Sequence, residues 1–434
     1  MRTKRILTAA VAAVTVITMA AGCSSSSGSA NNSAPPITLS FATNMVGSGS
    51  ATSPIVEQLI KDFEAKHPNV HIELQTAAGT ALQSLIQLSF SSNNVPDVFN
   101  FWRPQPAFNM DKYIASGKLG DLSSLAAEPS VKDLFDDSAW GTATVNGKVW
   151  GIPLQSFSVP LIVNTKVFAD AGLPLPTTWD NLVSDVAALK AKGIIPWMVS
   201  QMPAEQSNER LLDYVLDREL GNQKALDLYA GKVSFKSPEV EKALADYLSI
   251  SVKAGPSDSS ALTNNAAIAK YFNTGRAAMM LTNSGYLPAI DKAVASDMKV
   301  IPFPTIPGGA QTTANMEKDL TALMYASAKG LADPNKGPVI KDFLKFFTSH
   351  EAQTLLANQS ILVPAIGVKG DPASTSTLFV DVQAQSAAAP GDKWLGNART
   401  PSQQQVFYPL VAQAWTGAFT ATQFADQLES MFHK

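Results

Sequence analysis

Cysteine, charge and long apolar runs are all scarce in this chain of 434 residues. It has one cysteine, and only 16% of its residues are charged. One cysteine excludes an internal disulfide and any zinc or iron–sulfur site that needs several cysteine ligands from this chain. The formal net charge of −3, without a basic block, gives no electrostatic reason to expect a nucleic-acid partner. The length suffices for two or three domains with hydrophobic cores of their own.

The N-terminus carries the pattern of a secretory signal. Arg2, Lys4 and Arg5 precede an uncharged, mostly apolar run over residues 6–21, which is shorter than the roughly 20 residues of a membrane-spanning helix. Small residues then lead to Cys23, the only cysteine.

The surroundings of Cys23 resemble a bacterial lipoprotein signal. Ser, Gly, Ala, Asn and Pro alone make up the stretch that follows, and such a stretch cannot bury apolar surface. The resemblance implies that residues 1–22 are removed, that Cys23 is lipidated, and that residues 23–36 form a flexible tether. A plain secretory signal with an incidental cysteine is the alternative.

Apolar periodicity beyond the tether predicts alternating strands and helices. Ser53 as N-cap and Pro54 at the first helical position predict the start of the first helix. The predicted order is strand 37–41, helix from 54, strand 70–74, helix 81–90 and strand 98–101. This order favours an α/β domain with a mainly parallel sheet, in which ligands bind at the carboxyl ends of the strands. Loops 44–50 and 100–104 lie at those ends.

The rest of the chain is predicted to be extended at first and then mostly helical. Thr178 is the expected cap of a helix that Gly193 closes. Predicted extended segments cover 147–154, 159–164 and 300–304; residues 205–295 are mostly helical, and 401–432 form two helices.

Four segments carry a family resemblance, in the right order along nearly the whole chain. They are Pro96-Asp97-Val98-Phe99, Gly151-Ile152-Pro153 with residues 161–168, Gly275-Arg276-Ala277-Ala278-Met279 within residues 272–286, and residues 343–364. Together they resemble the extracellular solute-binding proteins of family 1, relatives of maltose-binding protein that deliver sugars to ATP-binding cassette importers.

The resemblance implies an α/β, two-lobed, periplasmic-binding-protein-like fold with discontinuous lobes and a hinge crossed several times. Lobe one would contain residues 37–156 and 303–363, and lobe two residues 158–301 and 366–434. It also implies a carbohydrate ligand held between the lobes, permease partners, a lipid anchor at the outer face of the cytoplasmic membrane, and a monomer. No cofactor, no metal and no catalytic residue are expected.

A sugar presents an apolar face and a rim of hydroxyls, so its site needs flat aromatic side chains and planar polar ones. Trp102 follows the third predicted strand, Trp197 ends another strand, and Trp394 lies in a polar loop without apolar periodicity. Tyr286 falls where the family carries a stacking aromatic residue. These four are the predicted aromatic contacts.

Polar candidates are expected at strand ends and in hinge loops, where binding residues are concentrated. They are Asn44, Asn100, Gln155, Asn283, Glu317 and Arg399.

Other chemistries find less support in the sequence. His67 and His71 could hold a metal only on one helix, and Pro68 separates them. A glycoside hydrolase would need two carboxyls about 5–10 Å apart, for which Asp136-Asp137 and Glu317/Asp319 are the imaginable pairs. A receptor for a peptide, a polyamine or a metal complex remains an alternative to a sugar receptor.

Overall fold

The computed structural model describes residues 35–47, 52–77, 79–102, 110–202, 207–389 and 391–433. The predicted signal segment, Cys23 and nearly all of the predicted tether lie outside this part of the chain. Across these described ranges, no helix combines the length and the apolar composition that a membrane span requires.

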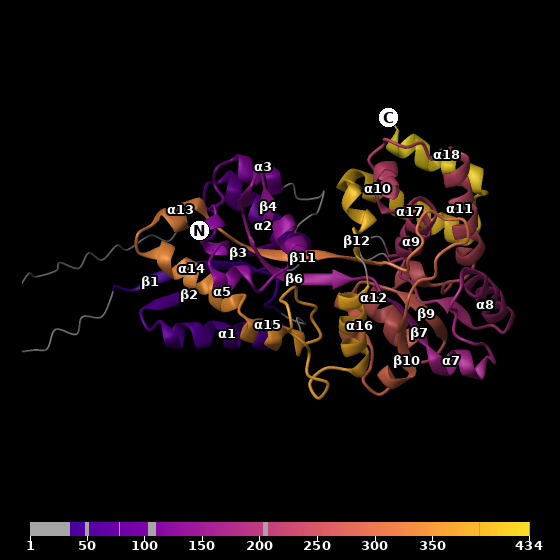
Figure 1. Cartoon of the computed structure of the whole chain (residues 1–434), viewed down its shortest axis with the longest axis horizontal. Helices are drawn as coiled ribbons and strands as arrows, with labels where there is room; N and C mark the ends of the chain where they lie inside the picture. The colour runs from indigo at the N-terminus through magenta and orange to yellow at the C-terminus, as the bar shows by residue number, and fades with distance from the viewer. Residues whose placement is uncertain are drawn as a thin grey trace, which may run out of the picture. The chain divides into compact units, whose positions relative to one another are not determined.

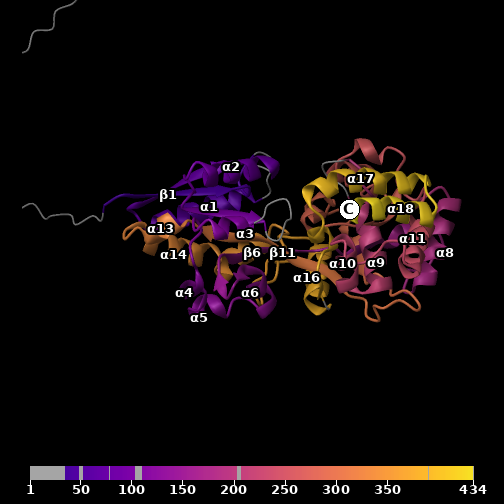
Figure 2. The ribbon, with the colours of Figure 1, turned by 90° about the horizontal axis from the view of Figure 1, so that it is seen from above.

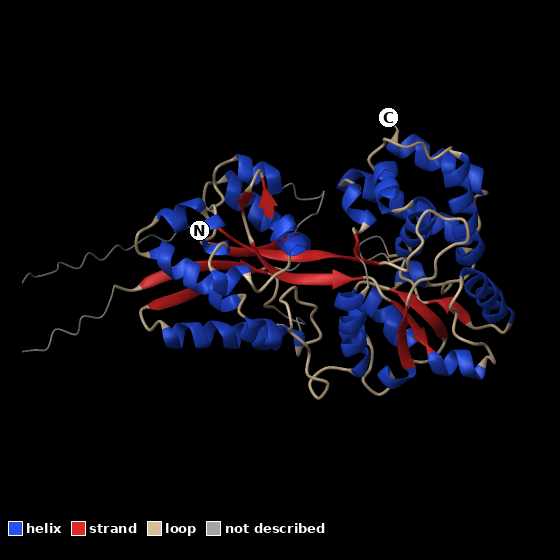
Figure 3. Cartoon of the chain, in the orientation of Figure 1, coloured by secondary structure: helices blue, strands red, loops and turns tan. Residues whose placement is uncertain are grey.

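Twelve strands and eighteen α-helices make up most of the described residues (Figures 1 and 3). The strands are β1 (Ile37–Thr43), β2 (Val70–Thr76), β3 (Val98–Trp102), β4 (Thr144–Val145), β5 (Lys148–Val149), β6 (Ile152–Ser158), β7 (Leu161–Asn164), β8 (Ile195–Trp197), β9 (Ala277–Leu281), β10 (Met298–Ile301), β11 (Met316–Ala326) and β12 (Gly391–Asp392). The helices are α1 (Ser53–Lys66), α2 (Gly79–Ser91), α3 (Met110–Ala115), α4 (Ser123–Ala126), α5 (Pro129–Lys132), α6 (Asp137–Ala143), α7 (Thr165–Asp170), α8 (Trp179–Ala191), α9 (Glu209–Leu220), α10 (Asn222–Tyr229), α11 (Pro238–Ser251), α12 (Asn264–Ala267), α13 (Ala328–Ala332), α14 (Lys336–Phe347), α15 (His350–Ala357), α16 (Thr377–Ala388), α17 (Pro401–Thr416) and α18 (Ala421–Phe432). Short 3₁₀ or π turns are η1 (Ser259–Ala261), η2 (Ile268–Phe272), η3 (Ser284–Ala289), η4 (Ala295–Asp297) and η5 (Leu395–Ala398).

The first sheet has the strand order β12-β11-β3-β1-β2, and β6 also pairs with β11. β1 is parallel to β2 and β3, as the alternation of strands and helices predicts, whereas β11 is antiparallel to β3 and β6. Successive residues of a strand point to opposite faces, so Phe41 packs with α1 and α14 while Ala42 packs with α2. Helices therefore cover both faces of this sheet.

The second sheet has the order β10-β7-β9-β8, with only the β8–β9 pair parallel. Leu161 and Val163 of β7 face a core that α8, α9, α11, α17 and α18 share, and Ile162 faces a core with α16. α17 and α18, drawn in yellow, lie side by side in Figure 2. Each begins with a capping box, from Thr400 and Thr420, which satisfies backbone N–H groups of the first turn.

One local prediction is wrong, and one stretch predicted to be mostly helical contains a strand as well. Ser53 does not cap α1: the helix begins at Ser53, and its hydroxyl bonds to the carbonyl oxygen of Gly47 (3.0 Å). β9 lies in the stretch predicted to be mostly helical, since its Ala and Met residues favour helices. All of its residues are buried, so both faces are covered, and this favours a central strand.

β11 is the largest omission of the sequence-based prediction. It is the longest strand and pairs with both β3 and β6 (Figure 1). Central strands usually read as apolar runs, and the consecutive Glu317, Lys318 and Asp319 hide this one. It also makes the first sheet mixed rather than mainly parallel.

The sequence-based prediction assigns the chain from residue 303 onward to lobe one. The segment between β10 and β11 packs elsewhere. Phe303 and Ile306 are buried in the core around α9, together with Tyr214. The segment just after β10 therefore belongs with the second sheet, and the chain joins the first sheet only at β11.

Candidate functional site

The carboxyl ends of β1 and β3 bring two of the predicted polar residues together. Asn100 is buried, and its Nδ2 donates to Oδ1 of Asn44 over 2.8 Å, whereas Asn100 Oδ1 has no hydrogen-bond partner in the described part of the chain. Trp102 is half-buried two residues further along β3, in edge contact with Phe101. This edge thus offers one amide oxygen and one aromatic side chain.

Two other predicted residues lie on the turn after β9. Asn283 caps η3, since its side chain accepts from the backbone N–H of Gly285 (2.8 Å). Tyr286 follows in that turn and is half-buried. Gln155 lies apart from them, half-buried in β6 opposite Ala322 of β11.

A polar cluster, the α9 cluster, forms around the start of α9. Its members are Asn208, Glu209, Arg210, Glu317 and Trp394. Asn208, Glu209, Arg210 and Glu317 are all more than nine-tenths buried. Arg210 Nε lies 3.2 Å from Glu209 Oε1, and the Arg210 guanidinium lies 4.4 Å from the centre of the Trp394 ring. Helix α9 therefore holds the Arg210 guanidinium between the Glu209 carboxyl and an aromatic ring.

The Trp394 ring is held from several sides. Besides Arg210, Phe157 of β6 meets it edge-on, with ring centres 5.7 Å apart. A Cβ atom at Gly396 would lie 2.1 Å from the Trp394 ring, so only glycine permits this close approach. The ring is therefore fixed in place, which a stacking surface requires.

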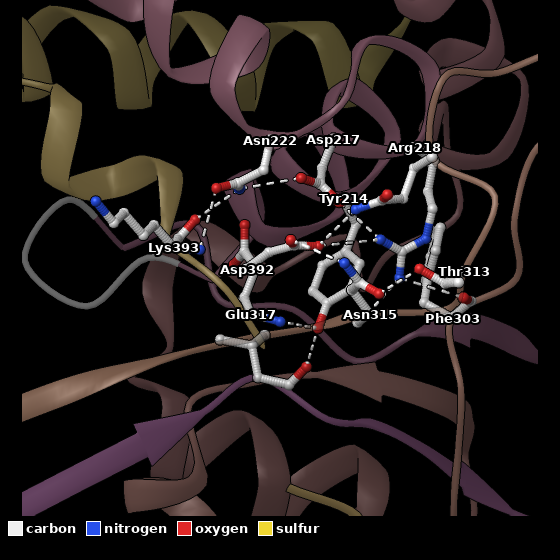
Figure 4. Close-up of polar contacts among 12 residues, drawn as sticks. Tyr214, Asp217, Arg218, Asn222, Phe303, Thr313, Asn315, Glu317, Asp392 and Lys393 are labelled. Carbon is white, nitrogen blue, oxygen red and sulfur yellow. Dashed lines mark hydrogen bonds and ion pairs between the residues drawn. The ribbon is translucent and has the colours of Figure 1, made fainter. Parts of the chain in front are cut away.

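Among the members of the α9 cluster, Glu317 gives the strongest indication of a binding site. It is 1% exposed, and neither of its carboxyl oxygens has a hydrogen-bond partner among the described residues. Its backbone N–H donates to the hydroxyl of Tyr214 (3.1 Å; Figure 4). Burial, and then repulsion from Asp213, raise the pKa of Glu317 well above its usual range. The carboxyl is thus dehydrated and lacks the partners that normally offset this cost.

Other polar atoms of the α9 cluster share this lack of partners in the described chain. Donors are Asn208 Nδ2, Arg210 Nη1 and Trp394 Nε1; acceptors are Asn208 Oδ1, Glu209 Oε2 and both oxygens of Glu317. Asn208 occupies the N-cap position of α9, yet its side chain makes no capping bond. A ligand that both donates and accepts hydrogen bonds would match this set.

Two predicted ligand residues are placed in the core instead. Trp197 is 1% exposed, and its indole N–H donates to the carbonyl oxygen of Ile250 (2.9 Å). Arg399 is fully buried and forms a two-pronged ion pair with Asp213, at 2.7 and 2.8 Å. The Trp197 indole and both terminal nitrogens of Arg399 are thus engaged inside the core around α9, whereas Arg399 Nε has no hydrogen-bond partner in the described part of the chain.

Asn208, Glu209 and Arg210 are not among the site residues predicted from the sequence. They begin a helix whose charged residues alternate with apolar ones, a pattern typical of a half-exposed helix. Instead, nearly every residue of α9 is buried. The one signal that the sequence offers is the position of these polar and charged residues directly before the apolar pair Leu211-Leu212.

A cavity of about 990 Å³ lies along β6 and β11. It is bordered by α6, residues 362–368 and α16, and it contains three carboxyls and two amines from Asp136, Asp319, Asp392, Lys318 and Lys393. None of the ten predicted ligand residues lines it.

One carboxyl of each pair considered for hydrolysis, Asp136 and Asp319, is engaged in hydrogen bonds within the fold. Asp136 caps α6 through a bond from the backbone N–H of Ala139 (2.8 Å). Burial raises the pKa of Asp319 to about 6, and Asn397 donates to its Oδ2 over 3.0 Å. Across the described ranges, no group of three metal-binding side chains comes together.

The model of one protein family, described as bacterial extracellular solute-binding protein, matches residues 46–354. The chain belongs to this family. The resemblance found in the sequence is therefore confirmed, and with it the two-lobed α/β fold.

Sequence relatives are similar over parts of their length. The chain is 31% identical over 147 residues to the multiple sugar-binding protein of Streptococcus mutans, which is 33% of each chain. It is 33% identical over 153 residues to the diacetylchitobiose binding protein of Streptomyces coelicolor, covering 35% of this chain and 34% of that one. An uncharacterized ABC transporter extracellular-binding protein of Pyrococcus horikoshii is 27% identical over 56% of this chain and 58% of its own. These alignments span less than two thirds of each relative.

Solved structures show the same fold at low identity. A chitin oligosaccharide binding protein superposes with a TM-score of 0.77 at 22% identity, covering 91% of this chain and 98% of its own. Maltose-bound MalE3 of T. maritima gives 0.66 at 18% identity, with 91% and 99% covered.

Proposed function

We propose that the chain is the substrate-binding lipoprotein of an ATP-binding cassette importer, and that it captures a mono- or oligosaccharide between two lobes. The observation that carries this proposal is the α9 cluster: it holds buried donors and acceptors without partners, and one of its members, Arg210, lies against the fixed ring of Trp394. Hydroxyl groups both donate and accept, so a polyol satisfies this mixture. A dication would meet the charge of Arg210, which disfavours it.

The relatives support the same class of ligand. Two of the proteins that the chain resembles in sequence carry sugars in their names, and solved neighbours include chitin-oligosaccharide and maltose receptors. We assign the ligand-facing role to Asn44, Asn100, Trp102, Gln155, Asn283, Tyr286, Glu317 and Trp394, and add Asn208, Glu209 and Arg210. Trp197 and Arg399 are left out of this set.

The remaining parts of the proposal follow from family membership and from the N-terminal sequence. Cys23 carries the lipid, the tether of residues 23–36 spans to the folded part, and permease subunits receive the sugar from the closed form. The mature protein works as a monomer at the outer face of the membrane, without cofactor and without catalysis. Lobe two then begins after Ser158 and includes Phe303 and Ile306, in line with their packing.

A thermal-shift panel tests the ligand class. Mono- and oligosaccharides of several linkages are compared with peptides, polyamines and chelated metals on the same protein preparation. A bound sugar raises the melting temperature in proportion to the logarithm of its concentration over Kd. A peptide, polyamine or metal complex that raises it, with every sugar inactive, would contradict the proposal. Release of reducing ends from a bound oligosaccharide would instead favour the hydrolase.

A further inference from the structure

The second half of α9 is bonded to the segments through which the chain passes between its two sheets (Figure 4). The hydroxyl of Tyr214 donates to the carbonyl oxygen of Val159 (2.5 Å), between β6 and β7. The same hydroxyl accepts from the backbone N–H of Glu317 (3.1 Å), at the start of β11. β6 and β11 belong to the first sheet, and β7 belongs to the second. The Tyr214 hydroxyl therefore joins helix α9 to two of the segments by which the chain passes between the two sheets.

Arg218, one turn further along α9, extends this link to more of the hinge. It is fully buried, and its Nη2 donates to the carbonyl oxygens of Asn315 (2.5 Å) and Phe303 (3.4 Å), which lie between β10 and β11. Its Nη1 lies 2.7 Å from Asp217 Oδ2 and 3.9 Å from Asp392 Oδ2, in β12. A planar guanidinium can hold several acceptors at once, which an ammonium group cannot do in the same geometry.

Two carboxyls compete for this one guanidinium. The amides of Asn315 and Gln311 donate to Asp392, at 2.9 and 3.0 Å, and the amide of Asn222 donates to Asp217 at 3.0 Å. These bonds hold the two carboxyls close to Arg218, but amides carry no charge. One negative charge is therefore in excess whenever both carboxyls are ionised.

The neighbouring charged groups do not supply the missing positive charge. Glu317 of β11 is acidic, and Asp213 of α9 is already paired with Arg399. Lys393, next to Asp392, directs its side chain away from Asp217 in Figure 4. Burial, and then repulsion from Asp392, raise the pKa of Asp217 to about 7. The pair therefore takes up or loses a proton near neutral pH.

We propose that Arg218 and the Asp217–Asp392 pair are positioning residues of the hinge: they hold its segments against α9 when one carboxyl is protonated and loosen them when both are charged. The inference rests on the proposed function, because a solute-binding protein must open and close its lobes around the ligand. Helix α9 starts at the α9 cluster and ends at this network, so ligand contact and hinge restraint share one rigid element. The spread of lobe separations then increases as pH rises through neutrality.

The distance between the lobes can be measured without any ligand. Leu88 of α2 and Val406 of α17 are exposed and suit paired labels, and Cys23 is the only other thiol of the chain. The full chain carrying Cys23→Ser, Leu88→Cys and Val406→Cys is labelled with spin probes. Distance distributions are then recorded by pulsed electron paramagnetic resonance between pH 5.5 and 8.5.

We expect the distribution to broaden with rising pH, with a midpoint near 7. Asp392→Asn keeps the shape of the side chain but leaves Asp217 as the only carboxyl of the pair, which Arg218 can balance at any pH, so the distribution should stay narrow up to pH 8.5. Arg218→Lys keeps the charge but loses the bonds to Asn315 and Phe303, and gives the broad distribution already at pH 6. Asp185→Asn, which changes a buried carboxyl of α8 outside the hinge, serves as matched control and leaves the midpoint unchanged.

A distribution that stays the same across this pH range in the parent chain would overturn the inference, as would broadening of the Asp392→Asn distribution with the midpoint of the parent. If Arg218→Lys does not fold, the isosteric Asp392→Asn variant still decides the question. Because no sugar is present, the result is independent of the ligand panel. Failure of the sugar panel with a pH-dependent distance would contradict the proposed function alone, and sugar binding with a constant distance would contradict the hinge inference alone.

Discussion

Single residues of the α9 cluster owe their chemistry to burial. Glu317 and Asn208 would be ordinary polar side chains on a loop, where water satisfies every donor and acceptor. In the folded chain they are buried, and their side-chain donors and acceptors have no partner among the described residues. A ligand can supply the hydrogen bonds that they lack. Trp394 adds the apolar surface, and Gly396 permits its position.

Replacing Trp394 by Ala should weaken sugar binding at least about ten-fold, which corresponds to about 1.4 kcal/mol. The substitution removes the stacking surface and the contact with the Arg210 guanidinium. Isothermal calorimetry with the sugar found in the panel measures the change, and Trp394→Phe should retain most of the affinity. Equal affinities of the Ala variant and the parent would remove Trp394 from the site.

Glu317→Gln should change the pH dependence of stability. Because burial raises the pKa of Glu317, the folded chain keeps a proton that the unfolded chain loses at lower pH. The corresponding stability is present below the ordinary pKa of a glutamate and is lost as pH rises through the raised value in the folded state. The Gln variant has no such proton, so its free energy of unfolding should decline less over that range. Urea unfolding at a series of pH values measures this.

The matched control for Glu317→Gln is Glu351→Gln, at an exposed position of α15. It should leave the pH profile of the unfolding free energy as in the parent. Parallel profiles for the parent and Glu317→Gln would mean that Glu317 is not protonated in the folded chain.

At the scale of elements, helix α9 contributes charged side chains to the α9 cluster, to the core and to the hinge. Its start carries Glu209 and Arg210, its middle holds Asp213 for Arg399, and its end holds Arg218 in the hinge. Burial of such a helix carries an unfavourable desolvation free energy, because each charge must be paired or neutralised. That cost explains why its partners come from segments far apart in the sequence.

Arg399→Ala should lower the free energy of unfolding by about 3–5 kcal/mol, because it leaves Asp213 buried without its counter-ion. The variant also loses the packing of the guanidinium on Tyr229 and Phe407, whose ring centres both lie 4.5 Å away. Denaturant unfolding checks the prediction, and the exposed Arg276→Ala should cost much less. A small loss for Arg399→Ala, together with a large loss of sugar affinity, would return Arg399 to the ligand site.

At the scale of the whole molecule, the proposed lipid anchor and nearly all of the proposed tether lie outside the described residues. Cys23→Ser should abolish incorporation of labelled palmitate in growing cells and should shift the protein from the membrane fraction to the medium. The folded part contains no cysteine, so the variant should bind its sugar as the parent does. Undiminished labelling of the Cys23→Ser variant would contradict the anchor.

The sequence by itself determined the family, the alternation of strands and helices in the first sheet, and the edge where Asn44 and Asn100 meet. These features depend on local periodicity and on short segments that residues close in sequence define. Family membership then implied two lobes and a discontinuous hinge, before any contact was known.

Only the tertiary structure decided which polar residues are buried and which are partnered. Trp197 and Arg399 lie in the core, where residues far away in sequence, Ile250 and Asp213, accept from the Trp197 indole N–H and from both terminal nitrogens of Arg399. Glu317, on a strand that its charges concealed, lies buried without such partners. Burial and pairing depend on contacts between distant segments, and no local pattern encodes these; for that reason the fold followed from the sequence, whereas the α9 cluster and the Arg218 network emerged from the folded chain.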